Sequence, residues 1–451
     1  AGKRLAGPHI FAIGERSFQL TELCGMFLGV QVREGTWMRR FCDSRGRLPI
    51  VRSVVEVLIC ANILISCWLY VSVFASSLSI ITPAPFVPSS LVDVSKCMQQ
   101  CHALSDETCL ASAACKWTNA TCSKGPELRE YCAESYSVFA WGFGIVMSAV
   151  LCMDVSGLSS MQGSMTLFAF LSLTVMVTTC LIAIKDDQGD IKGWDAIPQT
   201  DLSGLGQIIT AAVTSQISHQ GVPSLVVLMR KKRNSRKIFG GALCYTLVMY
   251  ILLCMSTSVF FGPNIANIVT LNWEEYSGGA PPGEAVPWWA GGLSYMVLLF
   301  PVVSVAAAFP LQIVVVSEII LKALGLEASD PTRAIWRQAP VRIVCCFAAV
   351  CLAQVCDKVQ AIIEFNGLVC ILIAFVLPCV LHLNARRASV IRWGSNGVKT
   401  RYHAWYSHGW CVWGMLLLSL SLEAFAVLQV FSSLMGGVSS LVEAGAAGAE
   451  R

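Results

Sequence analysis

Long apolar stretches separated by short polar or basic segments dominate this sequence of 451 residues. An α-helix needs about 20 apolar residues to cross the hydrocarbon core of a bilayer. The pattern therefore predicts an all-α, polytopic integral membrane protein with about nine transmembrane helices. The stretches that reach or approach that length are residues 53–82, 133–153, 164–184, 205–229, 238–262, 288–321, 341–356, 359–383 and 410–433.

The composition agrees with a membrane protein. Hydrophobic residues make up 55% of the chain and charged residues only 13%, whereas soluble domains carry about 25% charged residues. The formal net charge of +4 restricts the function less than the positions of the charges do. The sequence starts at Ala1 and shows no signal peptide, so we expect an N-terminally incomplete chain.

The positions of Lys and Arg predict the orientation, because these residues concentrate on the cytosolic side of membrane proteins. With the N-terminal segment in the cytosol and strict alternation, the cytosolic segments carry 24 of the 32 Lys and Arg residues and the opposite side carries 8. The run RKKRNSRK at 230–237 is interpreted as a cytosolic membrane anchor rather than a nucleic-acid-binding segment. The predicted parts are a cytosolic segment (1–52), a transmembrane domain (53–433) with an inserted non-cytosolic loop (83–132), and a non-cytosolic tail (434–451).

The inserted loop is rich in cysteine. Six cysteines in a short non-cytosolic stretch are typical of up to three disulfides in an oxidising compartment. Zinc binding is the alternative, but no His-Cys spacing here matches a zinc finger. Asn119 begins a glycosylation sequon on the same side, although Cys122 follows it at once and can hinder its use. The candidate disulfide cysteines are Cys97, Cys101, Cys109, Cys115, Cys122 and Cys132.

The stretch Leu205–Arg230 is long enough to cross a bilayer but contains many polar residues. Gly221 and Pro223 are expected to break its helix, and broken helices at membrane depth line cavities in many transporters. A kinked, packed helix is the alternative. His219 is the best ionisable candidate, because an unperturbed pKa of about 6.5 suits proton exchange; a neutral, hydrogen-bonded histidine is the other interpretation. The polar residues that interrupt the stretch are Gln207, Thr210, Thr214, Ser215, Gln216, Ser218, His219 and Gln220.

Two further positions are candidates for gating or coupling. Glu364 begins the eighth predicted span, and Pro310 interrupts the sixth span within a run of small residues. An intramembrane carboxylate is a functional candidate by default, and proline frees a backbone carbonyl; close helix packing would also explain the small residues. No phosphate-binding glycine loop, zinc-binding histidine pair or nucleophile motif is present in the sequence. We therefore expect no enzyme activity, no metal and no cofactor.

Four segments resemble the amino acid/auxin permease family, which includes neutral and proton-coupled amino acid transporters. Their order and spacing are more specific than any one motif. The second segment places small residues before a histidine and a proline, and the fourth has a glycine followed by a "FxLP" pattern. The segments are IGERSF at 13–18 followed by residues 46–78, then Val213–Pro223, AAAFPLQIVVVSE at Ala306–Glu318, and NGLVCILIAFVLP at Asn366–Pro378.

This resemblance implies an inverted-repeat (LeuT-like) fold of eleven helices, with the substrate held where the first and sixth helices unwind. The given sequence then begins between the second and third helices, so that the first helix and half of the site are missing from it. Ala308 replaces the threonine expected in sodium-coupled members. The implied substrate-binding residues are Ser215, Ser218, His219, Gln220 and Gly221, joined by Asn62 or Cys67 from the third helix.

The predicted function is secondary transport of an amino acid by alternating access, proton-coupled or facilitative. Its partners are the amino acid, protons in the coupled case, and the lipid bilayer, with no nucleic acid. A non-transporting sensor or receptor that uses the cysteine-rich loop is the alternative. The plasma membrane and a vacuolar or lysosomal membrane fit equally well, with residues 230–237 on the cytosolic side in both cases.

Overall fold

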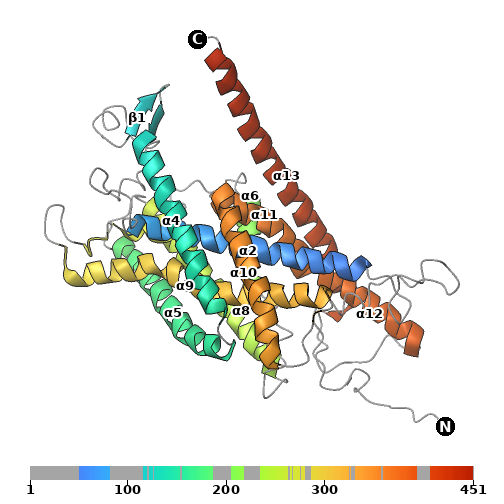
Figure 1. Ribbon diagram of the computed structural model, residues 1–451. Helices are drawn as coiled ribbons and strands as arrows, with labels where there is room; N and C mark the ends of the chain where they lie inside the picture. Colours follow the sequence, from blue (N-terminus) through green and yellow to red (C-terminus); the bar gives the residue numbers. More distant parts are fainter. Residues whose placement is uncertain are drawn as a thin grey trace, which may run out of the picture. The chain divides into compact units, whose positions relative to one another are not determined.

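The structure is a computed structural model of the chain. It describes residues 50–81, 115–118, 121–124, 126–152, 155–185, 205–217, 234–262, 265–266, 268–274, 276–279, 286–324, 326, 331–356, 359–393 and 407–449. These residues are helical apart from one short hairpin and a few connecting positions (Figure 1). The all-α prediction is therefore confirmed at the level of class.

The elements follow the apolar stretches of the sequence. Most helices are long. A helix satisfies its own backbone N–H and C=O groups, so an uninterrupted apolar run can stay helical across the lipid. The elements are α2 (Ile50–Ile81), β1 (Cys115–Thr118), β2 (Thr121–Lys124), α4 (Pro126–Leu151), α5 (Val155–Lys185), α6 (Leu205–Gln216), α8 (Ser235–Phe261), the 3₁₀ helix η8 (Val269–Trp273), α9 (Trp288–Ala323), α10 (Pro331–Val355), α11 (Val359–Ile371), the π-helical turn η9 (Leu372–Val376), α12 (Leu377–Trp393) and α13 (Gly409–Ala449).

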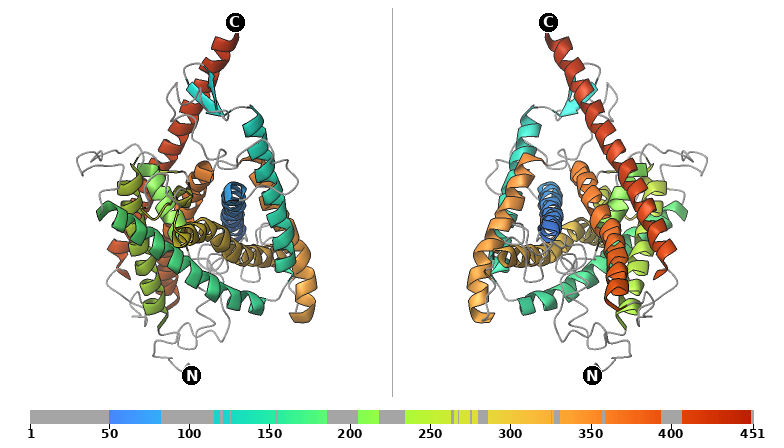
Figure 2. Two further views of the ribbon diagram at one scale, coloured as in Figure 1. Left: turned by 90° about the vertical axis from the view of Figure 1, so that its left-hand side faces the viewer. Right: turned by 90° about the vertical axis from the view of Figure 1, so that its right-hand side faces the viewer.

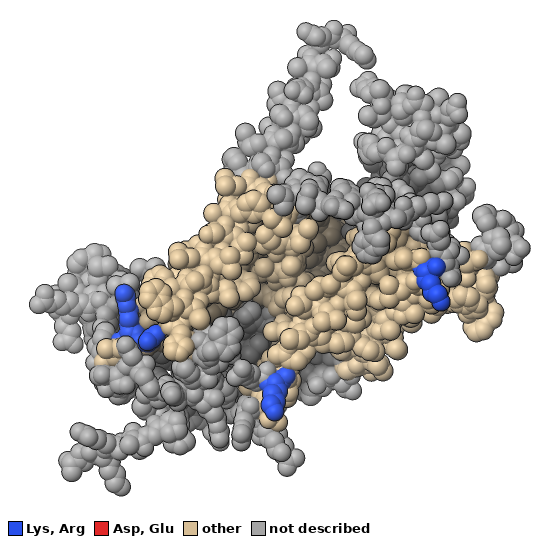
Figure 3. Space-filling view, turned by 180° about the vertical axis from the view of Figure 1, so that it is seen from behind, with Lys and Arg blue, Asp and Glu red and all other residues tan. Residues whose placement is uncertain are grey.

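Among the described residues, eight helices are long and apolar enough to cross a membrane. Each matches one predicted span. The ninth, predicted over 205–229, is described only as far as Ile217. On the face shown in Figure 3, only isolated Lys or Arg side chains interrupt the described surface, and no described Asp or Glu is visible. The matching spans are Ser53–Ser79, Glu134–Leu151, Gly163–Lys185, Lys237–Phe261, Trp288–Ala323, Gln338–Val355, Val359–Arg387 and Gly409–Val430.

The chain divides into two compact units. Unit 1 comprises Ala1–Asn62, Thr200–Leu247 and Ile363–Arg451, and unit 2 comprises Ile63–Gln199 and Val248–Ile362. In unit 1, α6, η9 and α12 all pack against α13. A small apolar cluster of Cys379, Val412 and Leu416 joins α12 to α13.

Helix α9 forms the centre of unit 2, where it packs against α4, α5 and α10. Phe143 of α4 is buried between Phe74 of α2 and Phe309 of α9, with ring centroids 4.5 and 4.9 Å away. Helices α4 and α10 lie side by side (Figure 2). They approach closely at Gly144, whose carbonyl accepts hydrogen bonds from the Ser148 hydroxyl (2.7 Å) and the Cys346 thiol (3.7 Å).

The short helix η8 is anchored in unit 2 by one buried tryptophan. The indole nitrogen of Trp273 donates to the Thr179 hydroxyl on α5 (3.1 Å). The backbone carbonyl of Trp273 accepts from the Ser294 hydroxyl on α9 (2.6 Å). Met176, Cys180 and Val297 complete the buried cluster around the ring. A connecting segment with both a large apolar contact and satisfied polar groups is fixed on the helices beneath it.

The hairpin lies in the predicted cysteine-rich loop. Strands β1 and β2 are antiparallel, and their register pairs Cys115 with Lys124 and Thr118 with Thr121. Cys115 and Cys122 lie in these strands and Cys132 in α4, whereas Cys97, Cys101, Cys109 and Asn119 lie outside the described residues. The disulfides and the glycan therefore remain predictions.

Candidate functional site

The first part of the site is α6 of unit 1, which places small residues on one face. Gly206, Thr210 and Thr214 follow one another at intervals of four residues, which puts them on one side of a helix. Gly206 and Thr210 are buried, and the Thr210 hydroxyl donates to the carbonyls of Gly206 and Gln207, both at 3.0 Å. The Thr210 hydroxyl therefore needs no partner outside its own helix. Because this face carries no bulky side chain, a neighbouring helix can approach it closely.

That neighbour is α11, and the two backbones are in direct contact. A Cβ atom on Gly367 would lie 2.7 Å from the Cα of Thr210 and 2.9 Å from its carbonyl oxygen. No side chain larger than that of glycine fits at such a distance. Close approach of this kind is how small residues join helices in membranes. One turn earlier in α6, the backbone N–H of Gly206 donates to the side-chain oxygen of Gln429 on α13 (2.6 Å).

A buried polar trio lies beside this crossing. The side-chain amide of Asn62 on α2 donates to the side-chain oxygen of Asn366 (3.0 Å) and to the thiol sulfur of Cys370 (3.0 Å), both on α11. Asn62 is 1% exposed, and Asn366 and Cys370 are fully buried. The trio is neutral, so it supplies amide and thiol groups at membrane depth without the cost of a buried charge.

Helix α6 ends next to this trio, in the middle of an apolar stretch. Its 12 residues span only about 18 Å, and Ile217 after it is not helical. Two polar atoms near its end, Thr214 Oγ1 and Gln216 Nε2, are buried and have no hydrogen-bond partner among the described residues. Thr214 lies near Cys370 but outside hydrogen-bond geometry, while Gln216 accepts a bond from Thr246 on α8 (3.1 Å). Buried polar groups normally have partners, so the partners of these two atoms are either residues outside the described part of the chain or a bound ligand.

A π-helical turn follows the trio directly. Residues Leu372–Val376 form η9, and the N–H of Leu377 donates to the carbonyl of Leu372. A single π turn within an α-helix is a local irregularity that is frequent at functional sites. Since η9 packs against α12 and α13, the irregularity connects the trio to both of these helices.

The comparison with known families now adds to this geometry. A family model described as "Transmembrane amino acid transporter protein" matches residues 128–427, which is about two thirds of the chain. The chain belongs to this family. The matched range contains α6, α11 and the start of α13, whereas Asn62 lies before it. The resemblance to amino acid permeases that the sequence indicated is thereby confirmed.

The chain is also similar to a curated protein of this membrane-protein type. It is 24% identical over 300 residues to a "Transmembrane protein 104 homolog" from Drosophila melanogaster, and the alignment covers 63% of this chain and 56% of that protein. The chain thus spans little more than half of the length of this relative.

Three of the predicted substrate-binding residues, Asn62, Cys67 and Ser215, are described, and they differ in their surroundings. Asn62 lies in the buried trio. Ser215 is exposed and its hydroxyl donates to the carbonyl of Ala212 in its own helix (2.8 Å). The remaining members of this predicted set, Ser218, His219, Gln220 and Gly221, lie outside the described residues.

The other predicted residues of this transporter-family chain lie on different elements. Cys67 is fully buried in unit 2, near Cys345 and Cys346 of α10. Pro310 is buried inside α9, which stays helical through it. Glu364 is half-buried in α11, two residues before Asn366 of the trio. No group of three or more metal-ligating side chains occurs in the part of the chain that the structure describes.

Sequence reasoning named Asn62 as a candidate and noted Thr210 and Thr214 among the polar residues of their stretch, but it assigned no role to Asn366 or Cys370. The common signal of the residues on α6 and α11 is spacing: 206, 210 and 214 on one helix, and 366 and 370 on the other, recur every four residues. A search for polar and small residues at helical spacing would have found both faces.

Proposed function

We propose that this chain is part of a secondary amino acid transporter that works by alternating access. The observation that carries the proposal is the end of α6 at Gln216, inside an apolar stretch that continues to residue 229. In transporters, a helix that stops at membrane depth exposes backbone groups that bind the substrate. Membership of the amino acid transporter family supplies the substrate class.

The site proposed for the amino acid is the end of α6 with the predicted residues that follow it. The Thr214 Oγ1 and Gln216 Nε2 atoms, which have no hydrogen-bond partner among the described residues, support a polar ligand there. Ser218, His219, Gln220 and Gly221 follow in the sequence and would offer hydroxyl, imidazole, amide and open backbone groups. A zwitterionic substrate needs such donors and acceptors, because leaving its charges unsatisfied in a dry site is costly.

Uptake assays test this site. Reconstituted in proteoliposomes, the wild-type protein should take up amino acids from a labelled mixture. His219→Ala and Gly221→Leu should each reduce uptake at least tenfold, because one removes a binding group and the other fills the open backbone. Gly414→Leu is the control, since a Cβ at Gly414 meets nothing within 4 Å. Unchanged uptake in both site variants would remove the site.

We propose that transport is either coupled to protons or facilitative, without a coupling ion. Ala308 in α9 has no side-chain oxygen for sodium. Glu423 in α13 is a candidate proton carrier, because its Oε2 atom is buried with no partner among the described residues. If protons drive transport, uptake should rise as the external pH falls, and Glu423→Gln should flatten that dependence. Wild-type uptake that does not change between mildly acidic and neutral buffer would favour facilitated exchange.

A sensor or receptor is the second candidate function. The hairpin β1–β2 gives the predicted cysteine-rich loop a structured element, and such a loop suits a binding role. Equilibrium binding of a labelled amino acid without uptake, in the same protein preparation, would favour the sensor. Binding together with uptake would favour the transporter.

A further inference from the structure

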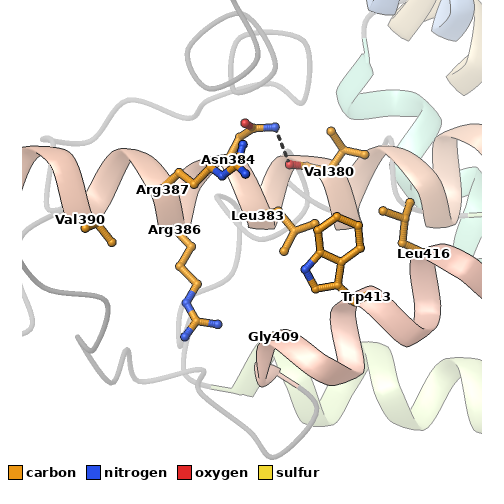
Figure 4. A pocket seen from close by; sticks show the side chains of 9 residues that line it. All are labelled: Val380, Leu383, Asn384, Arg386, Arg387, Val390, Gly409, Trp413 and Leu416. Atoms are coloured by element: carbon orange, nitrogen blue, oxygen red, sulfur yellow. Dashed lines mark hydrogen bonds between the residues drawn. The ribbon is translucent and has the colours of Figure 1, made fainter.

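A cavity between α12 and α13 is not used by the proposed transport site. Its volume is about 680 Å³, which lies within the range of ordinary ligand sites. Figure 4 shows α12 on one side and the start of α13 on the other, with Arg386, Leu383 and Trp413 between them. The lining residues are Val380, Leu383, Asn384, Arg386, Arg387, Val390, Gly409, Trp413 and Leu416.

The cavity is apolar at one end and basic at the other. Val380, Leu383 and Leu416 belong to the apolar packing that joins the two helices. Arg386 and Arg387 lie one to two helical turns further along α12, or about 5–10 Å away along the axis. A ligand that fills the cavity must therefore combine an apolar part with an anionic part.

Within the described part of the chain, the charges around the basic end have no counterion. The sequence contains no Asp or Glu between Glu364 and Glu423. Neither guanidinium has a hydrogen-bond or ion-pair partner among the described residues. The Arg386 Nη1 atom lies against the start of α13, only 2.8 Å from where a Cβ of Gly409 would be. A helix N-terminus carries positive partial charge, so two positive groups meet here and an anion between them would relieve their repulsion.

The position of the cavity relative to the membrane spans identifies the kind of anion. One apolar span ends at Arg387 and the next begins at Gly409, so the basic end lies where the spans meet the headgroup layer. Trp413, about one helical turn into α13, is 51% exposed, and tryptophan is common near membrane interfaces. The Lys and Arg distribution predicts the cytosolic side for residues 384–408, and that leaflet contains the anionic lipids.

We infer that this cavity binds an anionic glycerophospholipid. Arg386, Arg387 and the start of α13 hold the headgroup phosphate, and Val380, Leu383 and Leu416 hold the upper part of an acyl chain. Arginine suits this role because its planar group binds phosphate through two parallel hydrogen bonds. A free phosphate would satisfy the arginines but leave the apolar end empty, which is why the lipid is the better occupant.

Native mass spectrometry of the purified full chain in detergent micelles tests this site. The probe is palmitoyl-oleoyl phosphatidylserine, compared with phosphatidylcholine that has the same acyl chains. Wild-type protein should bind phosphatidylserine more tightly. Arg386→Gln/Arg387→Gln should weaken phosphatidylserine binding by on the order of tenfold, because each surface arginine contributes strongly to anionic lipid binding. The matched control, Lys185→Gln/Lys192→Gln, removes the same charge from the segment that is predicted to lie on the opposite side of the membrane and should change binding less than about twofold.

Two further variants keep the test decisive if the double glutamine variant does not fold. Arg386→Lys/Arg387→Lys retains the charge but loses the two parallel hydrogen bonds, so its binding should lie between that of the double glutamine variant and that of wild type. Leu383→Trp should reduce binding by filling the apolar end. An excess of inorganic phosphate should not displace the lipid. Equal binding of both lipids, or equal phosphatidylserine loss in the control, would overturn the inference. The inference would also be overturned if inorganic phosphate displaced the lipid and Leu383→Trp had no effect, because the cavity would then be a site for a small anion.

Discussion

At the scale of single residues, the Asn62 amide is the group whose surroundings are most specific. It donates to Asn366 and Cys370 at 3.0 Å each, and all three side chains are buried. In lipid or in a dry helix bundle, water does not replace a lost partner. The position of the Asn62 side chain therefore depends on α11, and the position of the Asn366 side chain depends on α2 in the same way.

A double-mutant cycle measures this dependence. Asn62→Ala and Asn366→Ala should each lower the free energy of unfolding, and the double variant should lower it by less than their sum. We expect an interaction energy of about 0.6 kcal/mol, the average for hydrogen bonds between membrane helices, and not more than about 1.7 kcal/mol. The measurement is unfolding of the purified protein in mixed detergent micelles.

Asn384 provides the control for that cycle. Its amide bonds the carbonyl of Val380 in its own helix at 3.0 Å, so Asn384→Ala and Asn62→Ala should be additive within about 0.5 kcal/mol. Strict additivity of Asn62→Ala with Asn366→Ala would show that the bond contributes nothing to stability.

At the scale of elements, the contact between α4 and α10 shows how one helix can present two different faces. Gly144 is buried, and a Cβ on it would lie 2.9 Å from Cγ2 of Val350. Gly142, two residues earlier, is exposed, and a Cβ there would meet nothing within 4 Å. Since successive side chains point about 100° apart around a helix, the two glycines lie on opposite faces.

These two glycines make a matched pair of substitutions. Gly144→Leu should separate α4 from α10 and lower the free energy of unfolding by about 1–3 kcal/mol, the usual cost of overpacking. Gly142→Leu should be neutral, or stabilising by up to about 1 kcal/mol, because leucine favours helices more than glycine does. Thermal unfolding in detergent measures both. Equal losses in the two variants would contradict a close approach of α4 and α10 at Gly144.

The length of each helix could be predicted from the sequence, but the partner of each helix face could not. The eight described spans could be predicted, because the length of an apolar run is a property of the sequence alone. The partners of buried polar residues could not. Asn62 and Asn366 are 304 positions apart, and helices that are apolar all round give no periodic signal of which face meets which helix. The hairpin and η8 were missed for another reason: both are short and lie in connecting segments.

At the scale of the whole molecule, orientation in the membrane decides what each site can meet. The proposed lipid site needs residues 384–408 on the cytosolic side, and the disulfide prediction needs residues 83–132 on the other side. Both follow from the same count of 24 against 8 basic residues. A reversed chain would place the cysteines in a reducing space and remove the arginines from the anionic leaflet.

Glycosylation mapping tests the orientation with the whole protein expressed in cells. The native sequon at Asn119 should carry a glycan, so endoglycosidase treatment should increase the gel mobility of wild-type protein but not of Asn119→Gln. In that background, Val398→Thr creates a new sequon that begins at Asn396, in the segment predicted to be cytosolic, and it should stay unmodified. Because Cys122 can hinder Asn119, absence of both glycans would call for a second acceptor elsewhere in 83–132. A glycan at Asn396 would reverse the predicted topology, and with it the leaflet from which the α12–α13 cavity takes its lipid.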